Sequence, residues 1–337
     1  MATKSMSVPW IMTPVVLVVL FGGLTGCEKK EAAPSQPAKL KLAGIVFQDD
    51  HFFRLVQFGM RDAARKADVE LLEANSNNRP EREIELVNTY VSRGVNAILI
   101  SPLSKKGSVA ALQLAKDKGI KIILHNTPIE GDLGETYIEC DPKDLGIRTG
   151  KAARQYIQEK LGGKANVAVI AFKSQIAEQS DARTNGFKSQ IEDLPGVRIV
   201  AEQDAWKAED AVNKAGAILS AHPEINLVWS ANEGGTIGSV LAVKNAGKAG
   251  QVVVFGTDCC DQLMEFLLSD DNILQAITSQ RPFDVGRMAV ESAVKVLKGQ
   301  PVEKKVYMSG ILLTRDDPAA VRAFQKQMKE WMSMGSP

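Results

Sequence analysis

The sequence predicts an α/β protein made of two doubly wound lobes, each built around a parallel sheet. Short apolar runs that indicate strands alternate with amphipathic helical patterns along most of the 337 residues. Such alternation is typical of parallel sheets that helices cover on both faces. About ten strand–helix units are more than one sheet comfortably holds. From about Leu40 onward the chain is also long enough for two domains of roughly 100–200 residues each.

The N-terminus, residues 1–26, is expected to be a lipoprotein signal peptide. Lys4 is the only charged residue before an apolar run that prolines interrupt, which is more typical of a secretion signal than of a membrane-spanning helix. The run leads to Leu24-Thr25-Gly26-Cys27, which resembles a bacterial lipobox. This resemblance implies cleavage before Cys27 and attachment of a lipid to its sulfur. The alternative is an uncleaved N-terminal anchor, and either arrangement puts the body of the protein outside the cytoplasm.

Residues 27–39 are expected to form a flexible tether. They are mostly polar or small, include Pro34 and Pro37, and show no apolar periodicity. A segment of this composition cannot bury a core of its own.

The balance of charge argues against one class of partner. Lys and Arg total 41, and Asp and Glu total 40. Proteins that bind nucleic acid by neutralising phosphates normally carry an excess of basic residues. We therefore expect no nucleic-acid partner.

The cysteines leave several pairings open. If Cys27 is lipidated, Cys140, Cys259 and Cys260 remain, which is an odd number for an exported protein. A strained bond between the two adjacent cysteines, a bond from one of them to Cys140, and free buried thiols are all compatible with the sequence, and free thiols are favoured. No metal-ligand spacing is present, so neither a metal nor a cofactor is expected.

The first half of the body begins with an apolar strand at Leu40–Phe47. From Phe52 onward, apolar residues recur every three or four positions, which predicts an amphipathic helix packed on the sheet of that strand. Pro80 suits the first turn of a second helix. The other elements expected in this half are strands at Val69–Glu73, Ala97–Ser101 and Lys121–Leu124, and a helix at about Lys106–Lys118.

The second half repeats the same alternation. Its predicted strands are Val167–Phe172, Val197–Glu202, Leu227–Ser230, Val252–Gly256 and Ile273–Thr278, and its predicted helices lie at about Glu178–Glu192, Ala208–Ala221, Thr236–Ala246 and Asp261–Ser269.

Planar polar or aromatic side chains follow nearly every predicted strand. In doubly wound sheets, ligands bind at the carboxyl ends of the strands. Carboxylate, amide and guanidinium groups can each hold adjacent hydroxyls, and flat aromatic rings pack against the C–H faces of a sugar. The pattern therefore favours a site for a monosaccharide. Taken singly, Asp50 and Asn232 also suit helix N-caps, and Trp206 suits a core position.

Several motifs, in their order along the chain, resemble the ribose- and galactose-type periplasmic binding proteins. The resemblance covers about residues 40–313 and implies the type I periplasmic binding protein fold, in which two similar lobes joined by a three-strand hinge close over a sugar. The motifs are Asp49-Asp-His-Phe-Phe53, Asn75-Ser-Asn-Asn78, the segment from Ser92 to Pro102, the segment from Ala221 to Asn232, Val254-Phe-Gly-Thr-Asp258, and the segment from Lys295 to Pro301.

The resemblance also implies where the chain passes between the lobes, namely near Asp141, Arg281 and Ser309. The N-terminal lobe would then comprise residues 40–141 plus 282–308. The C-terminal lobe would comprise residues 142–281 plus 309–332.

Carried over position by position, the resemblance implies ligand contacts from both lobes. Asp258 and Arg183 would hold hydroxyls through charge-assisted hydrogen bonds, and an aromatic side chain from each lobe would sandwich the ring. The full set of expected contacts is Asp50, Phe52, Phe53, His125, Asn126, Arg183, Trp206, Asn232, Asp258 and Gln280.

The match to any one sugar pattern is incomplete. Ribose binders tend to carry an Asp-Arg pair where this chain has His125-Asn126, and Asn where it has Asp50. Glucose and galactose binders share Asp50 and Trp206 more closely, but usually have an acidic residue in place of Gln179 and a calcium loop that this chain lacks. The expected ligand is therefore a hexose or a pentose.

By resemblance, the protein is expected to be the substrate-binding lipoprotein of an ABC-type sugar importer. It would be a monomer in the periplasm or at the outer face of the cell envelope, anchored to a membrane by its lipid, and would deliver its sugar to permease subunits. A sugar sensor that presents its closed form to a chemoreceptor or a sensor kinase stays open as an alternative. A sugar-responsive repressor would need a DNA-reading headpiece where the signal sequence stands, and no nucleophile elbow, phosphate-binding loop or metal motif indicates an enzyme.

Overall fold

A computed structural model describes residues 9–12, 14 and 39–334. The predicted lipidation site Cys27 and nearly all of the predicted tether lie outside these ranges. Contacts along the chain separate an N-terminal unit, residues 1–38, from a body, residues 39–337. Among the helices of the described ranges, none combines the length and the apolar character that a membrane crossing needs.

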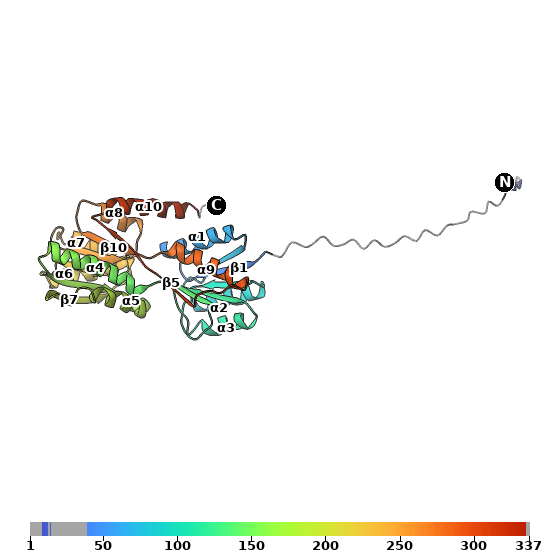
Figure 1. Ribbon diagram of the computed structural model, residues 1–337, viewed down its shortest axis with the longest axis horizontal. Helices are drawn as coiled ribbons and strands as arrows, with labels where there is room; N and C mark the ends of the chain where they lie inside the picture. The colour runs from blue at the N-terminus through green and yellow to red at the C-terminus, as the bar shows by residue number, and fades with distance from the viewer. Residues whose placement is uncertain (1–8, 13, 15–38, 335–337) are drawn as a thin grey trace, which may run out of the picture. The chain divides into compact units, whose positions relative to one another are not determined.

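The first lobe is built on a six-stranded sheet whose neighbouring strands are all parallel (Figure 1). Side chains along its first strand in the sequence, β1 (Lys41–Val46), alternate between two cores, with Leu42 and Val46 in one and Ala43 and Ile45 in the other. In spatial order the strands are β11 (Lys305–Met308), β5 (Thr136–Cys140), β4 (Lys121–His125), β3 (Ala97–Ile100), β1 (Lys41–Val46) and β2 (Glu70–Asn75). Helices α1 (His51–Lys66) and α9 (Pro282–Leu297) cover one face, and α2 (Pro80–Ser92) and α3 (Val109–Asp117) cover the other.

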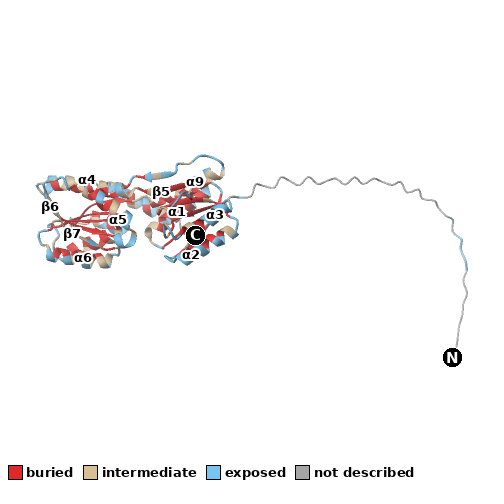
Figure 2. Ribbon diagram, turned by 90° about the horizontal axis from the view of Figure 1, so that it is seen from below, coloured by how far each residue is buried: buried red, intermediate tan, exposed pale blue. Residues whose placement is uncertain are grey.

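The second lobe repeats this architecture. Its strands, in spatial order, are β12 (Ile311–Thr314), β10 (Leu274–Ser279), β9 (Val253–Thr257), β8 (Leu227–Ser230), β6 (Lys164–Ala171) and β7 (Gly196–Asp204). Helices α4 (Pro142–Lys160) and α5 (Lys173–Lys188) cover one face, and α6 (Ala208–Ala221), α7 (Glu233–Asn245), α8 (Asp261–Leu268) and α10 (Pro318–Ser333) lie on the other. Both sheets are buried on their two faces (Figure 2). The predicted α/β class with two doubly wound lobes is confirmed.

The chain passes between the two sheets three times, after β5, after β10 and after β11. The last passage is nearly straight, because β11 ends at Met308 and β12 begins at Ile311. Strand β11 is parallel to β5, whereas β12 is antiparallel to β10. One extended segment thus leaves the first sheet along its strands and enters the second sheet against them, as expected if the carboxyl ends of the two sheets face each other.

The predicted elements agree best where the apolar pattern is regular. Strand β8 and helix α6 match their predicted bounds to the residue, and most other predicted elements are shifted by a few residues at both ends. Helix α5 begins five residues before its predicted start, at Lys173, and is kinked at Ile176. The elements that the sequence did not predict are β5, α4, α9, β11, β12 and α10.

Helix α4 was missed because glycines interrupt its apolar pattern. A Cβ atom on Gly146 would lie 1.9 Å from the carbonyl oxygen of Arg183 in α5. The corresponding contact in the first lobe is between α1 and α9, where a Cβ atom on Gly286 would lie 1.9 Å from the carbonyl oxygen of Val56. In each lobe, therefore, two helices on the same face of the sheet touch at their backbones.

Helix α10 contacts both lobes. It follows β12 of the second sheet and packs against α8, and it also reaches α1 of the first lobe (Figure 1). The ring of Trp331 stacks on Phe283 of α9 with centroids 4.7 Å apart and planes 7° from parallel. Leu55 and Phe58 of α1 belong to the same apolar core as the inner residues of α10.

Candidate ligand-binding cleft

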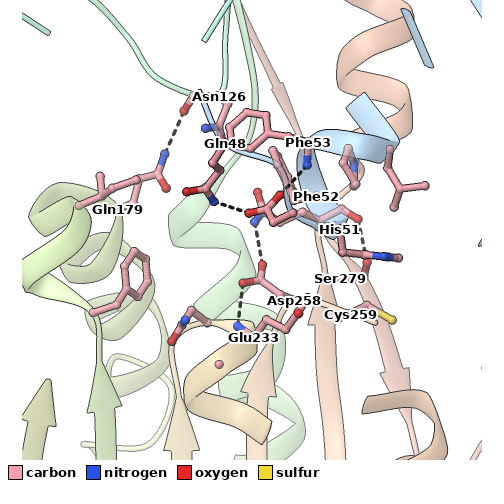
Figure 3. Close-up of a pocket in the computed structure, with 18 of the residues that line it drawn as sticks. Gln48, His51, Phe52, Phe53, Asn126, Gln179, Glu233, Asp258, Cys259 and Ser279 are labelled. Carbon is pink, nitrogen blue, oxygen red and sulfur yellow. Dashed lines mark hydrogen bonds between the residues drawn. The ribbon is translucent and has the colours of Figure 1, made fainter. Parts of the chain in front are cut away.

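A cavity of about 240 Å³ lies where the carboxyl ends of the two sheets meet (Figure 3). Its walls come from the segments that follow β1 and β4 in the first lobe and β6, β7, β8, β9 and β10 in the second. The volume is close to the lower end of the usual range for small-molecule pockets, about 300–1,000 Å³. The cleft therefore suits a small molecule.

All the expected ligand contacts except His125 line this cavity. The structure brings together Asp50, Phe52, Phe53, Asn126, Arg183, Trp206, Asn232, Asp258 and Gln280.

Asp258 is the most heavily bonded of these side chains. It follows β9 in a left-handed backbone conformation, with φ of 69°. Its carboxylate accepts hydrogen bonds from Nη1 of Arg183 at 3.2 Å, from Nε2 of Gln280 at 2.7 Å and from the backbone N–H of Glu233 at 3.0 Å. Asp258 thus joins three segments of the second lobe and has less capacity left for a ligand than the sequence suggested.

Arg183 is almost fully buried, and its Nη1 atom makes hydrogen bonds to two groups. Its side chain is 4% exposed, and Nη1 also donates to the carbonyl oxygen of Ala231 at 2.9 Å. The guanidinium lies 5.1 Å from the centroid of the Phe172 ring, and Nε is buried without a hydrogen-bond partner among the described residues. Such a fixed guanidinium can orient a ligand without losing rotamer freedom on binding.

Asp50 and Asn232 both cap helices. Oδ1 of Asp50 accepts from the backbone N–H of Phe53 at 2.8 Å at the start of α1, and its other oxygen accepts from Nε2 of Gln48. Oδ1 of Asn232 accepts from Gly235 N–H at 3.2 Å at the start of α7, and Nδ2 donates to the carbonyl oxygen of Trp206 at 2.8 Å. Asn232 is 3% exposed, so its side chain mainly stabilises the wall of the cleft.

Aromatic rings come from both lobes. In the first lobe Phe52 and Phe53 meet edge to face with centroids 5.2 Å apart. In the second lobe Trp206 and Phe172 lie 5.5 Å apart. Phe172 was not predicted to be a contact, although it directly follows β6, so the strand-end rule could have found it.

One hydrogen bond and one ion pair join the lobes beside the cavity. Nε2 of Gln179 in α5 donates to the carbonyl oxygen of Asn126 at 2.9 Å (Figure 3). Lys105 of the first lobe pairs with Glu178 of the second. Asn126 has a left-handed φ of 60°, which turns its carbonyl group toward the second lobe.

Glu233, the first residue of α7, is a cavity residue that the sequence analysis missed. Burial and, to a smaller extent, the nearby carboxylates of Asp258 and Asp50 together raise the pKa of its carboxyl to about 7. Its place directly after Asn232 at a strand end was the available signal. Further unpredicted lining residues include Gln48, His51, Ser279 and the α10 residues Phe324, Met328 and Trp331.

His125 does not reach the cavity. Strand alternation puts it on the same face of β4 as Ile123, whose core includes α1 and α9. The side chain is fully buried, and neither ring nitrogen has a partner among the described residues. Burial lowers its pKa to about 3, so the ring is neutral.

The described cysteines, Cys140, Cys259 and Cys260, are all free. Burial raises the pKa of the Cys140 and Cys260 thiols to about 12 and raises that of Cys259 as well, so the thiols stay protonated. The described part of the chain contains no group of three or more His, Cys, Asp or Glu side chains suited to a metal ion.

Comparison with known proteins gives consistent matches over most of the chain. A family model described as a periplasmic binding protein domain matches residues 44–301. The ABC transporter periplasmic-binding protein YphF of Escherichia coli (strain K12) is 27% identical over 275 residues, which cover 80% of this chain and 83% of that protein. The ribose import binding protein RbsB of Salmonella typhimurium is 30% identical over 260 residues, covering 75% and 83%. Among solved structures, an ABC transporter periplasmic solute-binding protein from Actinobacillus succinogenes with bound D-allose superposes with a TM-score of 0.76 at 26% identity, covering 84% of this chain and all of that one.

Proposed function

Because the chain belongs to the periplasmic binding protein domain family, we propose that it captures a monosaccharide between its lobes and delivers it to an ABC-type importer. The family consists of solute-binding proteins and not of enzymes, and membership implies a location in the periplasm. The relative named for ribose import and the solved structure with bound D-allose support a sugar as the ligand class.

The cavity carries this proposal. It offers hydrogen-bonding groups on fixed supports, such as Arg183 and Gln280, together with aromatic rings from both lobes. Hydroxyls that both donate and accept, arranged around a ring with apolar C–H faces, complement this lining.

Delivery would depend on closure of the two lobes around the sugar. Three segments connect the lobes, and contacts such as Gln179 to Asn126 span the cleft from one lobe to the other. A ligand that touches both walls would favour the closed arrangement over an open one.

A thermal-shift screen of the full chain in mild detergent tests the proposal. The panel contains pentoses, hexoses, polyols and amino acids. A ligand at a hundred times its Kd stabilises the folded state by about 2.7 kcal/mol and raises the Tm. A shift with one monosaccharide, confirmed by calorimetry, is expected, whereas a shift with amino acids only would overturn the sugar class.

The lipid anchor is a separate part of the proposal. Replacement of Cys27 by Ser is expected to move the protein from the membrane fraction to the aqueous fraction of cell extracts. The Cys140→Ser variant serves as the control and is expected to stay with the membrane. Membrane association of both variants would argue for an uncleaved anchor.

A further inference from the structure

Three carboxylates line the cavity, and two of them have partners within the protein. Asp258 is paired with Arg183 at 3.2 Å. Asp50 accepts from the backbone N–H of Phe53 and from the amide of Gln48. Both carboxylates are therefore compensated before any ligand arrives.

Glu233 differs from these two because it lacks a cationic partner. Its backbone N–H donates to Asp258, but the Cys260 thiol is the single side-chain hydrogen-bond partner that the described residues give its carboxylate. It forms no ion pair with any Lys, Arg or His of the described chain. A thiol is a weak donor and leaves most of the capacity of a carboxylate unused.

The cations near the cavity are engaged elsewhere or lie toward solvent. Arg183 bonds to Asp258, and Arg54 pairs with Asp49 at 3.4 Å on the exposed side of α1. Lys207 is exposed at the N-cap of α6. His51 lines the cavity, but burial and Arg54 lower its pKa, which favours the neutral ring.

The electrostatic consequence is a half-buried carboxyl that resists ionisation in the absence of ligand. Burial is the main cause of its pKa near 7, the charges of Asp258 and Asp50 contribute to the rise, and the charge of Arg54 and the Cys260 thiol offset only part of it. A positive charge brought into contact with Glu233 would reverse this effect, because an opposite charge favours the ionised carboxylate.

We propose that Glu233 selects ligands that carry a protonated amino group, so that the preferred ligand is an amino sugar and not the corresponding neutral sugar. This inference rests on the proposed function and narrows its ligand class. The ring and hydroxyls of the sugar would contact the aromatic and amide groups of the cleft, while the ammonium group would donate to Glu233.

Calorimetric titration of the full chain in mild detergent with matched ligands tests this. Glucosamine and galactosamine are compared at pH 6.5, where their amines are largely protonated, with glucose and galactose. N-acetylglucosamine, whose nitrogen is uncharged, controls for the size of the substituent on the sugar ring. The amino sugars are expected to bind at least ten times more tightly than the neutral sugars, given the strength of a charge-assisted hydrogen bond.

The Glu233→Gln variant keeps the shape of the side chain and removes its charge. It is expected to abolish the tighter binding of amino sugars relative to the matched neutral sugars. The exposed Glu265→Gln in α8 is the control and is expected to retain the preference.

Proton release gives a readout that a purely structural role of Glu233 would not change. At pH 6.5 much of Glu233 is protonated without ligand, so contact with an ammonium group should expel a proton. Titrations in buffers of different ionisation enthalpy are expected to show this release for amino sugars with the wild-type chain and its loss in Glu233→Gln.

Tight binding of a neutral sugar with no gain from an amine would overturn this inference and leave the proposed function standing. Absence of binding by every sugar, amino or neutral, would overturn both. If Glu233→Gln failed to fold, the comparison of glucosamine with N-acetylglucosamine and the proton release by the wild-type chain would still decide the question.

Discussion

At the scale of single residues, Asp258 organises the second wall of the cleft. Its carboxylate connects α5, the end of β10 and the start of α7 through three hydrogen bonds. Because Arg183 is almost fully buried, its charge depends on this one carboxylate for compensation. A buried charge without its partner is strongly destabilising.

Replacement of Asp258 by Ala is therefore expected to lower the free energy of unfolding by about 3 kcal/mol, since it leaves Arg183 buried and unpaired. Urea denaturation monitored by circular dichroism measures this. The Asp49→Ala variant, which removes an exposed partner of Arg54, is the matched control and should lose well under 1 kcal/mol. Equal losses in the two variants would contradict the role given to Asp258.

The raised pKa of Glu233 predicts a pH dependence of stability. Because the folded state holds the proton up to about pH 7 and the unfolded state releases it near pH 4.5, this group disfavours folding increasingly as the pH rises between these values. Relative to wild type, Glu233→Gln is expected to gain about 2 kcal/mol of stability between pH 5 and pH 8. Denaturation midpoints measured at both pH values provide the test.

Glu139, whose pKa is also raised to about 7 by burial, offers a second site for the same comparison. A constant difference between wild type and Glu233→Gln across this range would show that Glu233 does not titrate as described.

Residue types at strand ends predicted most of the cleft but not its internal bonding. The rule that ligands bind at the carboxyl ends of strands placed Trp206, Asp258 and Gln280 correctly along the cavity wall. That Asp258 would be taken up by Arg183 depends on distances between segments 75 residues apart, which no local pattern contains. For His125 the rule gave a wrong prediction, because a position at the end of a strand does not by itself determine which face of the sheet the side chain occupies.

At the scale of elements, glycines at helix contacts determine how closely the helices pack. Gly59 and Gly286 both lie in the contact between α1 and α9, and Gly146 and Gly186 both lie in the contact between α4 and α5. Within α4, Gly146 lowers the helix propensity and interrupts the apolar stripe, which is why the sequence did not predict this helix. Helix α6, whose apolar positions are regular, was predicted to the residue.

Replacement of Gly286 by Ala is expected to lower the free energy of unfolding by about 3 kcal/mol or more. The new Cβ would lie 1.9 Å from a backbone oxygen of α1, and relief of this clash requires the helices to separate. The control is Gly216→Ala in α6, where no atom lies within 4 Å of the new Cβ. That variant should gain about 0.5–1 kcal/mol from helix propensity. Thermal or urea denaturation of both variants distinguishes the effect of the helix contact from the effect of helix propensity. If both substitutions stabilise the protein, the close contact at Gly286 does not limit the packing of the helices.

At the scale of the whole body, α10 adds a connection between the lobes besides the three chain passages. Its Trp331 stacks on Phe283 of the first lobe, while the helix itself follows the last strand of the second sheet. Any separation of the lobes on that side must break this stack or move α10 away from α8.

Replacement of Trp331 by Ala is expected to lower the free energy of unfolding by about 2 kcal/mol, because it removes a half-buried aromatic pair. It should also increase the radius of gyration of the ligand-free chain in small-angle scattering, since one contact that resists opening is lost. Met334→Ala, at the exposed end of the same helix, is the control and should change neither quantity measurably. An unchanged radius of gyration in the Trp331 variant would show that α10 does not restrain the lobes.

The two sheets share one strand order, and only the direction of the last strand differs. In evolutionary terms, this is the pattern that duplication of a half-length ancestor leaves behind. Each copy retains its own strand-end loops, and the cleft exists only where the two sets of loops meet. A mutation in one copy therefore remodels one wall while the inherited opposite wall keeps its shape. Such an arrangement lets new ligand preferences arise by changes in one half at a time.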